Sequence, residues 1–231
     1  MTITLITGGA RGLGREAARR LIAAGHTVYI GARDPGRGQQ VAVELGAHLL
    51  VLDVSDDASV DAAARRLQQE ASHLDVLVNN AAIAGPRKPP NEMTAADVRG
   101  VYETNVFGVI RVTGAFLPLL QAAPAPVVVN VSSGLGSLAR TTDPSRFESS
   151  GPFLAYASSK AAVNMLTVQY AKAFPAVRFN VVDPGYTATD LNRHRGTQTV
   201  TEGTDAIVRM ATLGANSPTA TFVDAKGRVP W

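Results

Sequence analysis

The sequence predicts an α/β fold with a doubly wound parallel sheet, formed by a single domain over residues 1–231. Strand-like and helical patterns alternate along the chain, as expected for a sheet built from strand, helix and strand in turn. The strand-like runs are almost continuously apolar, which is typical of parallel strands covered by helices on both faces. With 231 residues, 45% of them apolar, the chain can form one sizeable core.

The elements follow one another in a regular order. Strands are expected at residues 2–7, 27–32, 48–53, 75–80, 126–132 and 177–184. Helical patterns rich in Ala and Leu cover residues 12–24, 36–45, 56–71, 94–121 and 155–174, with a further helix near 202–213. Right-handed crossovers between parallel strands then predict a ligand crevice at the carboxyl ends of the strands, where the strand order reverses.

The composition argues against several classes of function. The chain has no cysteine and only four scattered histidines, so we expect no disulfide, no thiol nucleophile and no metal site. Its 22 Lys and Arg residues form no basic run, which argues against a nucleic-acid partner. No run of eighteen apolar residues and no signal segment is found. These observations predict a soluble cytoplasmic protein that contacts no membrane.

A glycine-rich turn, "TGGARGLG" at residues 7–14, joins the first strand to the first helix. Gly8, Gly12 and Gly14 let the backbone turn tightly and approach an anion, and the free N–H groups at the helix start would bind a diphosphate. A P-loop would need Lys and then Ser or Thr after Gly14, but Arg15 and Glu16 follow it. The G-x-G-x-x-G spacing does not fit either.

The spacing T-G-x-x-x-G-x-G resembles that of the short-chain dehydrogenase/reductase family. Six more family motifs follow in order over nearly the whole chain: "LDV" (52–54), "NNAA" (79–82), "TN" (104–105), "NVSS" (130–133), "YASSK" (156–160) and "DPGYTAT" (183–189). The final stretch, "PTATFVDAKGRVPW", is similar to the tail of carbonyl-reductase-like members. The resemblance implies a Rossmann-type fold and hydride transfer between a nicotinamide and a ketone, aldehyde, quinone or alcohol.

The second strand-like run ends in "GARD" (31–34), which bears on the choice of cofactor. In dinucleotide folds an acidic residue at this strand end binds the ribose of NAD, whereas arginine suits the extra phosphate of NADP. Ala32 at the acidic position and Arg33 beside it favour NADP(H), and Arg11 adds a second positive charge. In the alternative, Arg33 is solvated and Asp34 binds the ribose, which would give an NAD-preferring alcohol dehydrogenase.

The resemblance implies the remaining cofactor contacts. Asp53 and the Val54 backbone would hold the adenine edge, and Asn79 and Ala81 would line the adenosine ribose. Leu13 belongs to the glycine turn. The nicotinamide amide would be held by Pro184, Gly185, Thr187 and Thr189. Ala82 departs from the glycine that is usual in this motif, and we expect its added methyl to cost some of the close backbone approach without abolishing cofactor binding.

Tyr156 and Lys160 stand four positions apart, which places them on one face of a helix. An ammonium about 4 Å from the phenol, at an effective dielectric near 20, favours the phenolate by up to about 4 kcal/mol, or roughly three pKa units. We therefore expect Lys160 to lower the pKa of Tyr156, so that the phenol can exchange a proton with a carbonyl oxygen. Lys160 can also bind the nicotinamide ribose.

Two further polar residues complete the expected catalytic set. Ser133 is placed on the substrate oxygen and Ser132 is the weaker candidate, while Val131 stands where a hydrolase G-x-S-x-G elbow would need glycine. By resemblance, Asn105 holds a water that connects the lysine to solvent. A helical asparagine outside this setting would more often form a local kink or a core hydrogen bond.

Residues 134–155 and 190–213 are expected as substrate-side loops. Phe147, Phe153, Leu154 and Tyr186 would form an apolar entrance, or would belong to the core. The sequence leaves a monomer, homodimer or homotetramer open. It also leaves an alternative function, an NADP-sensing regulator without turnover, but the presence of all four catalytic side chains favours the enzyme with a small-molecule substrate.

Overall fold

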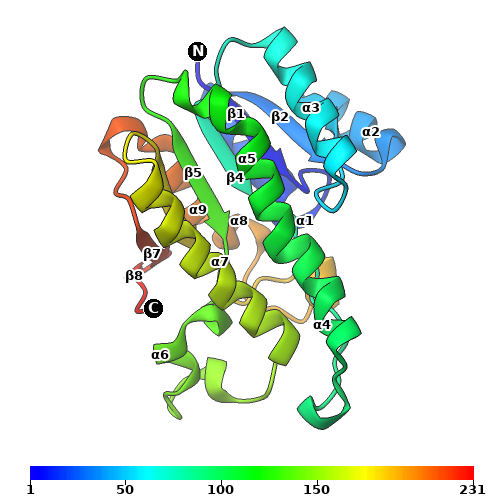
Figure 1. Cartoon of the computed structure of the whole chain (residues 1–231), viewed down its shortest axis with the longest axis vertical. Coiled ribbons are helices and arrows are strands. Elements are labelled where there is room, and N and C mark those ends of the chain that lie inside the picture. Colours follow the sequence, from blue (N-terminus) through cyan, green and yellow to red (C-terminus); the bar gives the residue numbers. More distant parts are fainter.

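The computed structural model describes all 231 residues, and it confirms the doubly wound α/β fold in one domain (Figure 1). One sheet has the strand order β3-β2-β1-β4-β5-β6-β7-β8, and every pair is parallel except β7 with β8. The strands are β1 (Ile3–Thr7), β2 (Thr27–Ala32), β3 (His48–Val51), β4 (Val76–Asn79), β5 (Val127–Val131), β6 (Arg178–Val182), β7 (Thr221–Asp224) and β8 (Gly227–Arg228).

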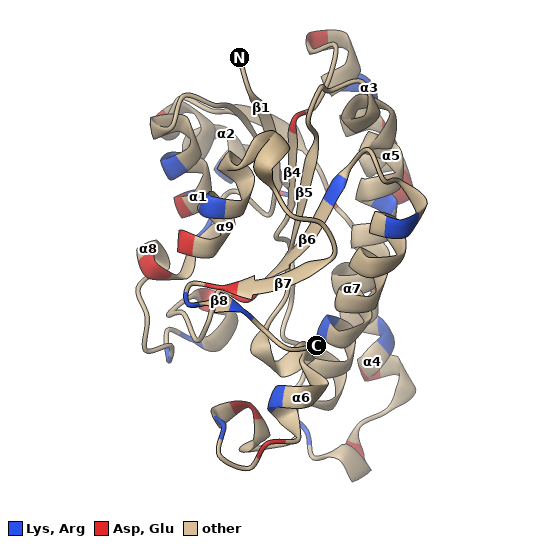
Figure 2. Cartoon of the chain, turned by 90° about the vertical axis from the view of Figure 1, so that its left-hand side faces the viewer, with Lys and Arg blue, Asp and Glu red and all other residues tan.

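Two layers of helices enclose the sheet, which Figure 2 shows edge-on between them. The helices are α1 (Gly12–Ala23), α2 (Pro35–Leu45), α3 (Asp57–Glu70), α4 (Ala95–Tyr102), α5 (Gly108–Gln121), α6 (Leu138–Thr141), α7 (Leu154–Ala173), α8 (Val200–Gly203) and α9 (Asp205–Thr212). Side chains of α1, α2 and α9 pack in one buried cluster with the sheet, and those of α3, α5 and α7 pack in another. Both sheet faces are therefore buried, as the continuous apolar runs predicted.

The strand order reverses at β1, which pairs with β2 on one side and with β4 on the other. Loops that leave the carboxyl ends of these two strands diverge to opposite sides of the sheet, and a crevice forms between them. The first loop is the glycine turn before α1, and the second begins with Asn80. The fold thus places the predicted motifs around one crevice.

Several elements differ from the sequence-based expectation. The helix expected over residues 94–121 is interrupted by a π-helical turn at Glu103–Phe107, between α4 and α5. The helix expected near 202–213 is divided into α8 and α9 at Thr204, and α6 lies inside the segment expected as a loop at 134–155. The strands β7 and β8 were not predicted, and β8 has only two residues, too few for a clear pattern.

The last residues of the chain fasten the segment that follows β5. The Ser137 hydroxyl donates a hydrogen bond to the carbonyl of Pro230 at 2.7 Å, and the Ala139 N–H donates to the carbonyl of Trp231 at 3.0 Å. The Trp231 ring packs against Phe222 of β7 with centroids 5.6 Å apart. No helix of the molecule combines the length and the apolar character that crossing a membrane requires.

Candidate active site

A cavity of about 1010 Å³ lies at the carboxyl ends of β1, β2, β4, β5 and β6. It extends from the glycine turn at one end to the segments around Phe147 and Tyr186 at the other. This volume is at the upper end of the usual range for ligand sites, which is consistent with two ligands bound side by side. All of the predicted site residues line the cavity except Gly14, Asn79 and Asn105.

The glycine turn forms the cradle that the sequence predicted. Gly8 and Gly12 have positive φ angles of 65° and 52°, a conformation that favours glycine. A Cβ atom on Gly8 would lie 3.1 Å from the Cα of Ala81, so a side chain at this position would press against the backbone that follows β4. No side chain caps α1, which leaves the N–H groups of its first turn available to an anion. These features fit a diphosphate.

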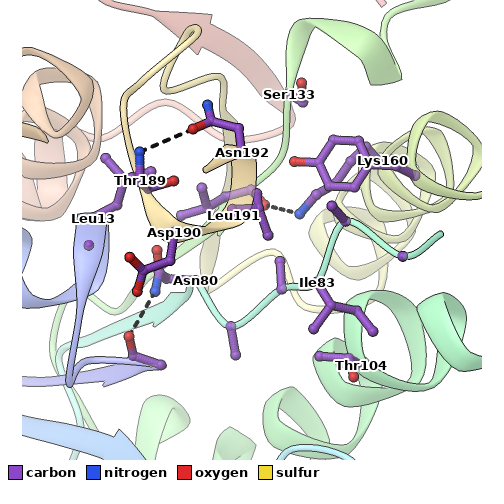
Figure 3. A pocket seen from close by; sticks show the side chains of 18 of the residues that line it. Leu13, Asn80, Ile83, Thr104, Ser133, Lys160, Thr189, Asp190, Leu191 and Asn192 are labelled. Carbon is purple, nitrogen blue, oxygen red and sulfur yellow. Dashed lines mark hydrogen bonds between the residues drawn. The ribbon is translucent and has the colours of Figure 1, made fainter. Parts of the chain in front are cut away.

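Gly14 has a different role from that of Gly8 and Gly12. It does not line the cavity, but a Cβ atom there would collide with the carbonyl oxygen of Gly8. Gly14 therefore lets α1 begin directly against the turn. Leu13, which lies between the two glycines, does line the cavity (Figure 3).

The end of the cavity that the glycine turn forms is rich in arginine. Arg33 is exposed at the end of β2, and Arg37 lines the same end. Arg11 pairs with Asp190 across the cavity, with Nη1 3.4 Å from Oδ2. The carboxylate of Asp34 accepts a hydrogen bond from the Arg37 N–H at 3.1 Å and caps α2. The one acidic side chain at the strand end is thus engaged in the helix cap.

Asp53 lines the cavity next to this basic group, and its carboxylate is held in place by Ser55. The backbone N–H and the hydroxyl of Ser55 donate to Asp53 Oδ1 at 2.9 and 2.6 Å. Burial would raise the pKa of Asp53, but the Ser55 hydrogen bonds and the nearby charge of Arg33 outweigh it and lower the pKa. Asp53 therefore presents an ionised carboxylate at the adenosine end.

The structure places Asn79 outside the cavity, so the expectation that it lines the adenosine ribose is wrong. Its side chain points into the core and donates hydrogen bonds to Asn130 Oδ1 at 2.9 Å and to Thr113 Oγ1 at 3.2 Å. The next residue, Asn80, lines the cavity instead (Figure 3), and its amide donates to the carbonyls of Thr7 and Gly8. Consecutive side chains of a strand point to opposite faces, and that alternation was the available signal.

Tyr156 and Lys160 lie on one face of α7, as their spacing predicted. The Lys160 Nζ is 5.6 Å from the centroid of the Tyr156 ring. Nζ donates a hydrogen bond to the carbonyl of Val131, at the end of β5, at 2.9 Å (Figure 3). Lys160 is only 3% exposed, and this carbonyl is the one acceptor that the protein provides for its three donors. Its remaining donors fit the hydroxyl groups of a ribose.

In the protein chain alone, the pKa of Tyr156 is raised and not lowered as expected. Burial raises the pKa of Tyr156, the charge of Asp183 raises it further, and a hydrogen bond with Ser133 lowers it in part. Burial also lowers the pKa of Lys160 to about 8. The sequence-based estimate was wrong because it counted the attraction between the two groups and omitted the cost of removing both from water. At neutral pH the phenol of Tyr156 carries its proton.

The two serines at the end of β5 have distinct environments. Ser133 lines the cavity, as Tyr156 does, and its Oγ accepts a hydrogen bond from the Leu135 N–H. Ser132 is buried and donates to Asn164 Oδ1 at 2.7 Å, which ties β5 to α7. The structure brings Ser133 to the tyrosine and directs the Ser132 hydroxyl into the core.

Asn105 lies behind the cavity wall, in the π-helical turn between α4 and α5. It is 1% exposed, and its amide donates to the Ile83 carbonyl at 3.0 Å and accepts from the Ile83 N–H at 2.9 Å. The same amide donates to the hydroxyl of Ser159 on α7. The core hydrogen bond that the sequence left open as an alternative is therefore present, and a water relay through Asn105 stays a prediction.

The end of the cavity opposite the arginines is mostly apolar. The four side chains expected at an apolar entrance all line it, namely Phe147, Phe153, Leu154 and Tyr186. The rings of Phe147 and Tyr186 pack against each other with centroids 5.3 Å apart. Leu191, on a short segment between β6 and α8, also lines the cavity (Figure 3). No group of three or more His, Asp or Glu side chains is placed to hold a metal ion.

Residues 2–199 match the family model described as short chain dehydrogenase. The chain belongs to this family. A short-chain dehydrogenase from Penicillium roqueforti, anuI, is 34% identical over 92% of this chain and 89% of its own length. The (+)-neomenthol dehydrogenase of Capsicum annuum is 27% identical over 94% of both chains. This short-chain dehydrogenase is therefore an oxidoreductase that acts on carbonyl or alcohol groups with a nicotinamide cofactor.

The solved structure of an NADPH-bound carbonyl reductase from chicken fatty liver is similar over the entire length of both chains. Its TM-score is 0.87 and its sequence identity is 26%. Salutaridine reductase from Papaver somniferum has a TM-score of 0.85 and 25% identity over 96% of this short-chain dehydrogenase and 99% of its own chain.

Proposed function

We propose that this short-chain dehydrogenase is an NADPH-dependent carbonyl reductase for apolar ketones, aldehydes or quinones. The observation that carries the proposal is the convergence of Ser133, Tyr156 and Lys160 on the boundary between a dinucleotide cradle and an apolar recess. The likeness to the NADPH-bound carbonyl reductase supports the same activity. The reaction requires a hydride donor, a proton donor and a space for the carbonyl compound, and this boundary provides all three positions.

The preference for NADP(H) rests on the charges at the adenosine end. Arg11, Arg33 and Arg37 give this end three guanidinium groups, which suit a phosphate monoester. Asp34, the residue that would select NAD, is engaged as the cap of α2. Asp53 and Val54 are assigned to the adenine edge and Ala81 to the adenosine ribose. The amide of the nicotinamide is assigned to Pro184, Gly185, Thr187 and Thr189, which line the opposite wall.

In the proposed mechanism a bound nicotinamide would supply the hydride. Tyr156 holds a proton at neutral pH and donates it to the carbonyl oxygen as that oxygen gains negative charge. Ser133 would donate a second hydrogen bond to the same oxygen. Lys160 holds the ribose with the donors that Val131 leaves free. Residues 134–155 and 190–213 are the substrate-side segments in this proposal.

The proposal is tested by following NADPH oxidation with a panel of aldehydes, ketones and quinones. We expect turnover of apolar members of the panel. Tyr156→Phe should then lower kcat/KM by about 1,000-fold or more and leave NADPH binding within about twofold, since only the transferred proton is lost. Tyr170→Phe removes a phenol from the same helix, far from the cavity, and should leave both quantities unchanged. Tight NADPH binding without turnover of any compound would instead support the NADP-sensing regulator.

A further inference from the structure

A buried cluster of charged side chains lies beside Gly134, the residue that follows Ser133. It consists of Arg140 on α6 and three carboxylates from three other parts of the chain: Glu148 in the turn at Phe147–Ser149, Asp183 after β6 and Asp224 at the end of β7. Arg140 Nη1 is 2.9 Å from Asp183 Oδ2 and 3.3 Å from Glu148 Oε1, and Nη2 is 2.7 Å from Asp224 Oδ2. The proposed mechanism assigns no role to this cluster.

The cluster is close to the reacting groups. A Cβ atom on Gly134, the residue after Ser133, would lie 3.0 Å from Asp183 Oδ2 and 3.2 Å from Arg140 Nη1. The other oxygen of Asp183 accepts a hydrogen bond from the Gly185 N–H at 2.9 Å, in the loop assigned to the nicotinamide. The negative charge of Asp183 also acts on Tyr156: the pKa of the phenol is raised mainly by burial and then by this carboxylate.

The charges within the cluster are unequal, because one buried guanidinium faces three carboxylates. A second arginine, Arg146, reaches Glu148 at 3.5 Å from the exposed side. Arg140 is therefore the one cation that contacts Asp183. Burial raises the pKa of Asp183, whereas the Gly185 N–H and the charge of Arg140 oppose this effect. The ionisation state of Asp183 therefore depends on Arg140.

We propose that Arg140 and Asp183 form a positioning pair that sets the proton affinity of Tyr156 and holds the 134–155 segment beside the substrate. This inference rests on the proposed function, because it assigns the pair to the proton donor of that reaction. Asp183 opposes the loss of the phenol proton, and Arg140 reduces that opposition by neutralising the carboxylate. Around these groups, Lys160 faces Tyr156 from α7, and Asp224 and Glu148 face Arg140.

The pH dependence of the reverse reaction tests the pair. Alcohol oxidation requires Tyr156 to accept a proton, so kcat/KM rises with pH as the phenol ionises. We expect Asp183→Asn to move the midpoint of this rise down by about one pH unit, and Arg140→Met to move it up. Arg140→Lys keeps the charge and should restore most of the wild-type profile. A purely structural role would lower the rate in these variants and leave the midpoint in place.

Asp224→Asn is the matched control, because Asp224 also pairs with Arg140 but, unlike Asp183, is not among the charges that raise the pKa of Tyr156. It should weaken folding and move the midpoint much less than Asp183→Asn does. If Arg140→Met does not fold, the two asparagine variants are sufficient. Equal midpoints in the wild type and Asp183→Asn, or an equal shift in Asp224→Asn, would overturn the proposal.

A second measurement separates this inference from the proposed function. The NMR signal of the labelled ring carbon that bears the Tyr156 hydroxyl, assigned with Tyr156→Phe, follows ionisation without turnover. Its titration should begin at lower pH in Asp183→Asn than in the wild type. If the wild type is inactive but the titration shifts, the carbonyl reductase function is rejected and the Arg140–Asp183 pair is supported. An active wild type without the shift would reject the pair alone.

Discussion

The side-chain amide of Asn105 pairs with both backbone polar groups of Ile83, accepting from its N–H at 2.9 Å and donating to its carbonyl at 3.0 Å. The π-helical turn at Glu103–Phe107 contains this asparagine, and Ile83 lies in the cavity wall. The pair thus fixes the loop after β4 from behind. The same amide reaches Ser159 on α7, one residue before Lys160.

Removing this amide should destabilise the fold. Asn105→Ala leaves the buried N–H and carbonyl of Ile83 without partners, and we expect the free energy of unfolding to fall by about 3 kcal/mol. Urea unfolding measures the effect. Ser159→Ala removes only one of the three hydrogen bonds of Asn105 and should cost about 1 kcal/mol. Equal losses in the two variants would contradict this account of the Ile83 pair.

Ser132 and Ser133 should separate stability from activity. Ser133→Ala removes a donor to the substrate oxygen, so we expect kcat/KM to fall by about 100-fold with little change in unfolding. Ser132→Ala leaves the buried Asn164 without its hydroxyl donor and should cost about 1–3 kcal/mol of stability, with a smaller effect on kcat/KM. Kinetics and urea unfolding of both variants test the assignment, and the reverse pattern would exchange the two roles.

The depressed pKa of Lys160 predicts a dependence of stability on pH. Burial lowers this pKa from 10.5 to about 8 in the folded chain. Between these values the unfolded chain binds a proton that the folded chain has released, so the free energy of unfolding should rise as pH increases from 8 towards 10.5. The expected gain from this group is at most about 3 kcal/mol.

This gain is measured as a difference, because other groups titrate in the same range. Urea unfolding at pH 7.5 and 10 should show a gain in the wild type that Lys160→Met lacks. Lys172→Met, an exposed change near the end of the same helix, should keep it. An identical gain in Lys160→Met would show that the buried ammonium is not its source.

Arg33 should determine the choice between the two nicotinamide cofactors. Arg33→Asp removes a guanidinium from the phosphate end and adds a repelling charge, so the ratio of kcat/KM for NADPH to that for NADH should fall on the order of 100-fold. Arg65→Asp makes the same change of charge on the outer face of α3, away from the cavity, and serves as the control. An unchanged ratio in Arg33→Asp would favour Asp34 as the ribose ligand and NAD as the cofactor.

The features that sequence predicted well depend on local geometry. The helical spacing of Tyr156 and Lys160, and the glycine turn with positive φ at Gly8 and Gly12, follow from neighbouring residues alone. Strands β1 to β6 were also evident, because a strand buried on both faces is apolar at most positions.

Other features depend on contacts between distant parts of the chain. The pKa of Tyr156 is governed by burial and by Asp183, which no spacing within α7 reveals. Arg140 meets carboxylates 43 and 84 positions away, and its own segment carried no recognisable pattern. The alternation of side chains along a strand would have directed Asn79 into the core, but the resemblance had assigned this residue to the cofactor ribose.

The hydrogen bonds from Ser137 and Ala139 to the last two residues have a consequence for local motion. Peeling of the final strand edge breaks the hydrogen bonds that hold the segment after Ser133, so both should exchange their amide hydrogens with solvent in one concerted event. A bulky carbonyl compound that needs this segment to move would therefore bind faster to molecules in which these C-terminal hydrogen bonds are broken. The rate of that local opening would then limit the rate of binding.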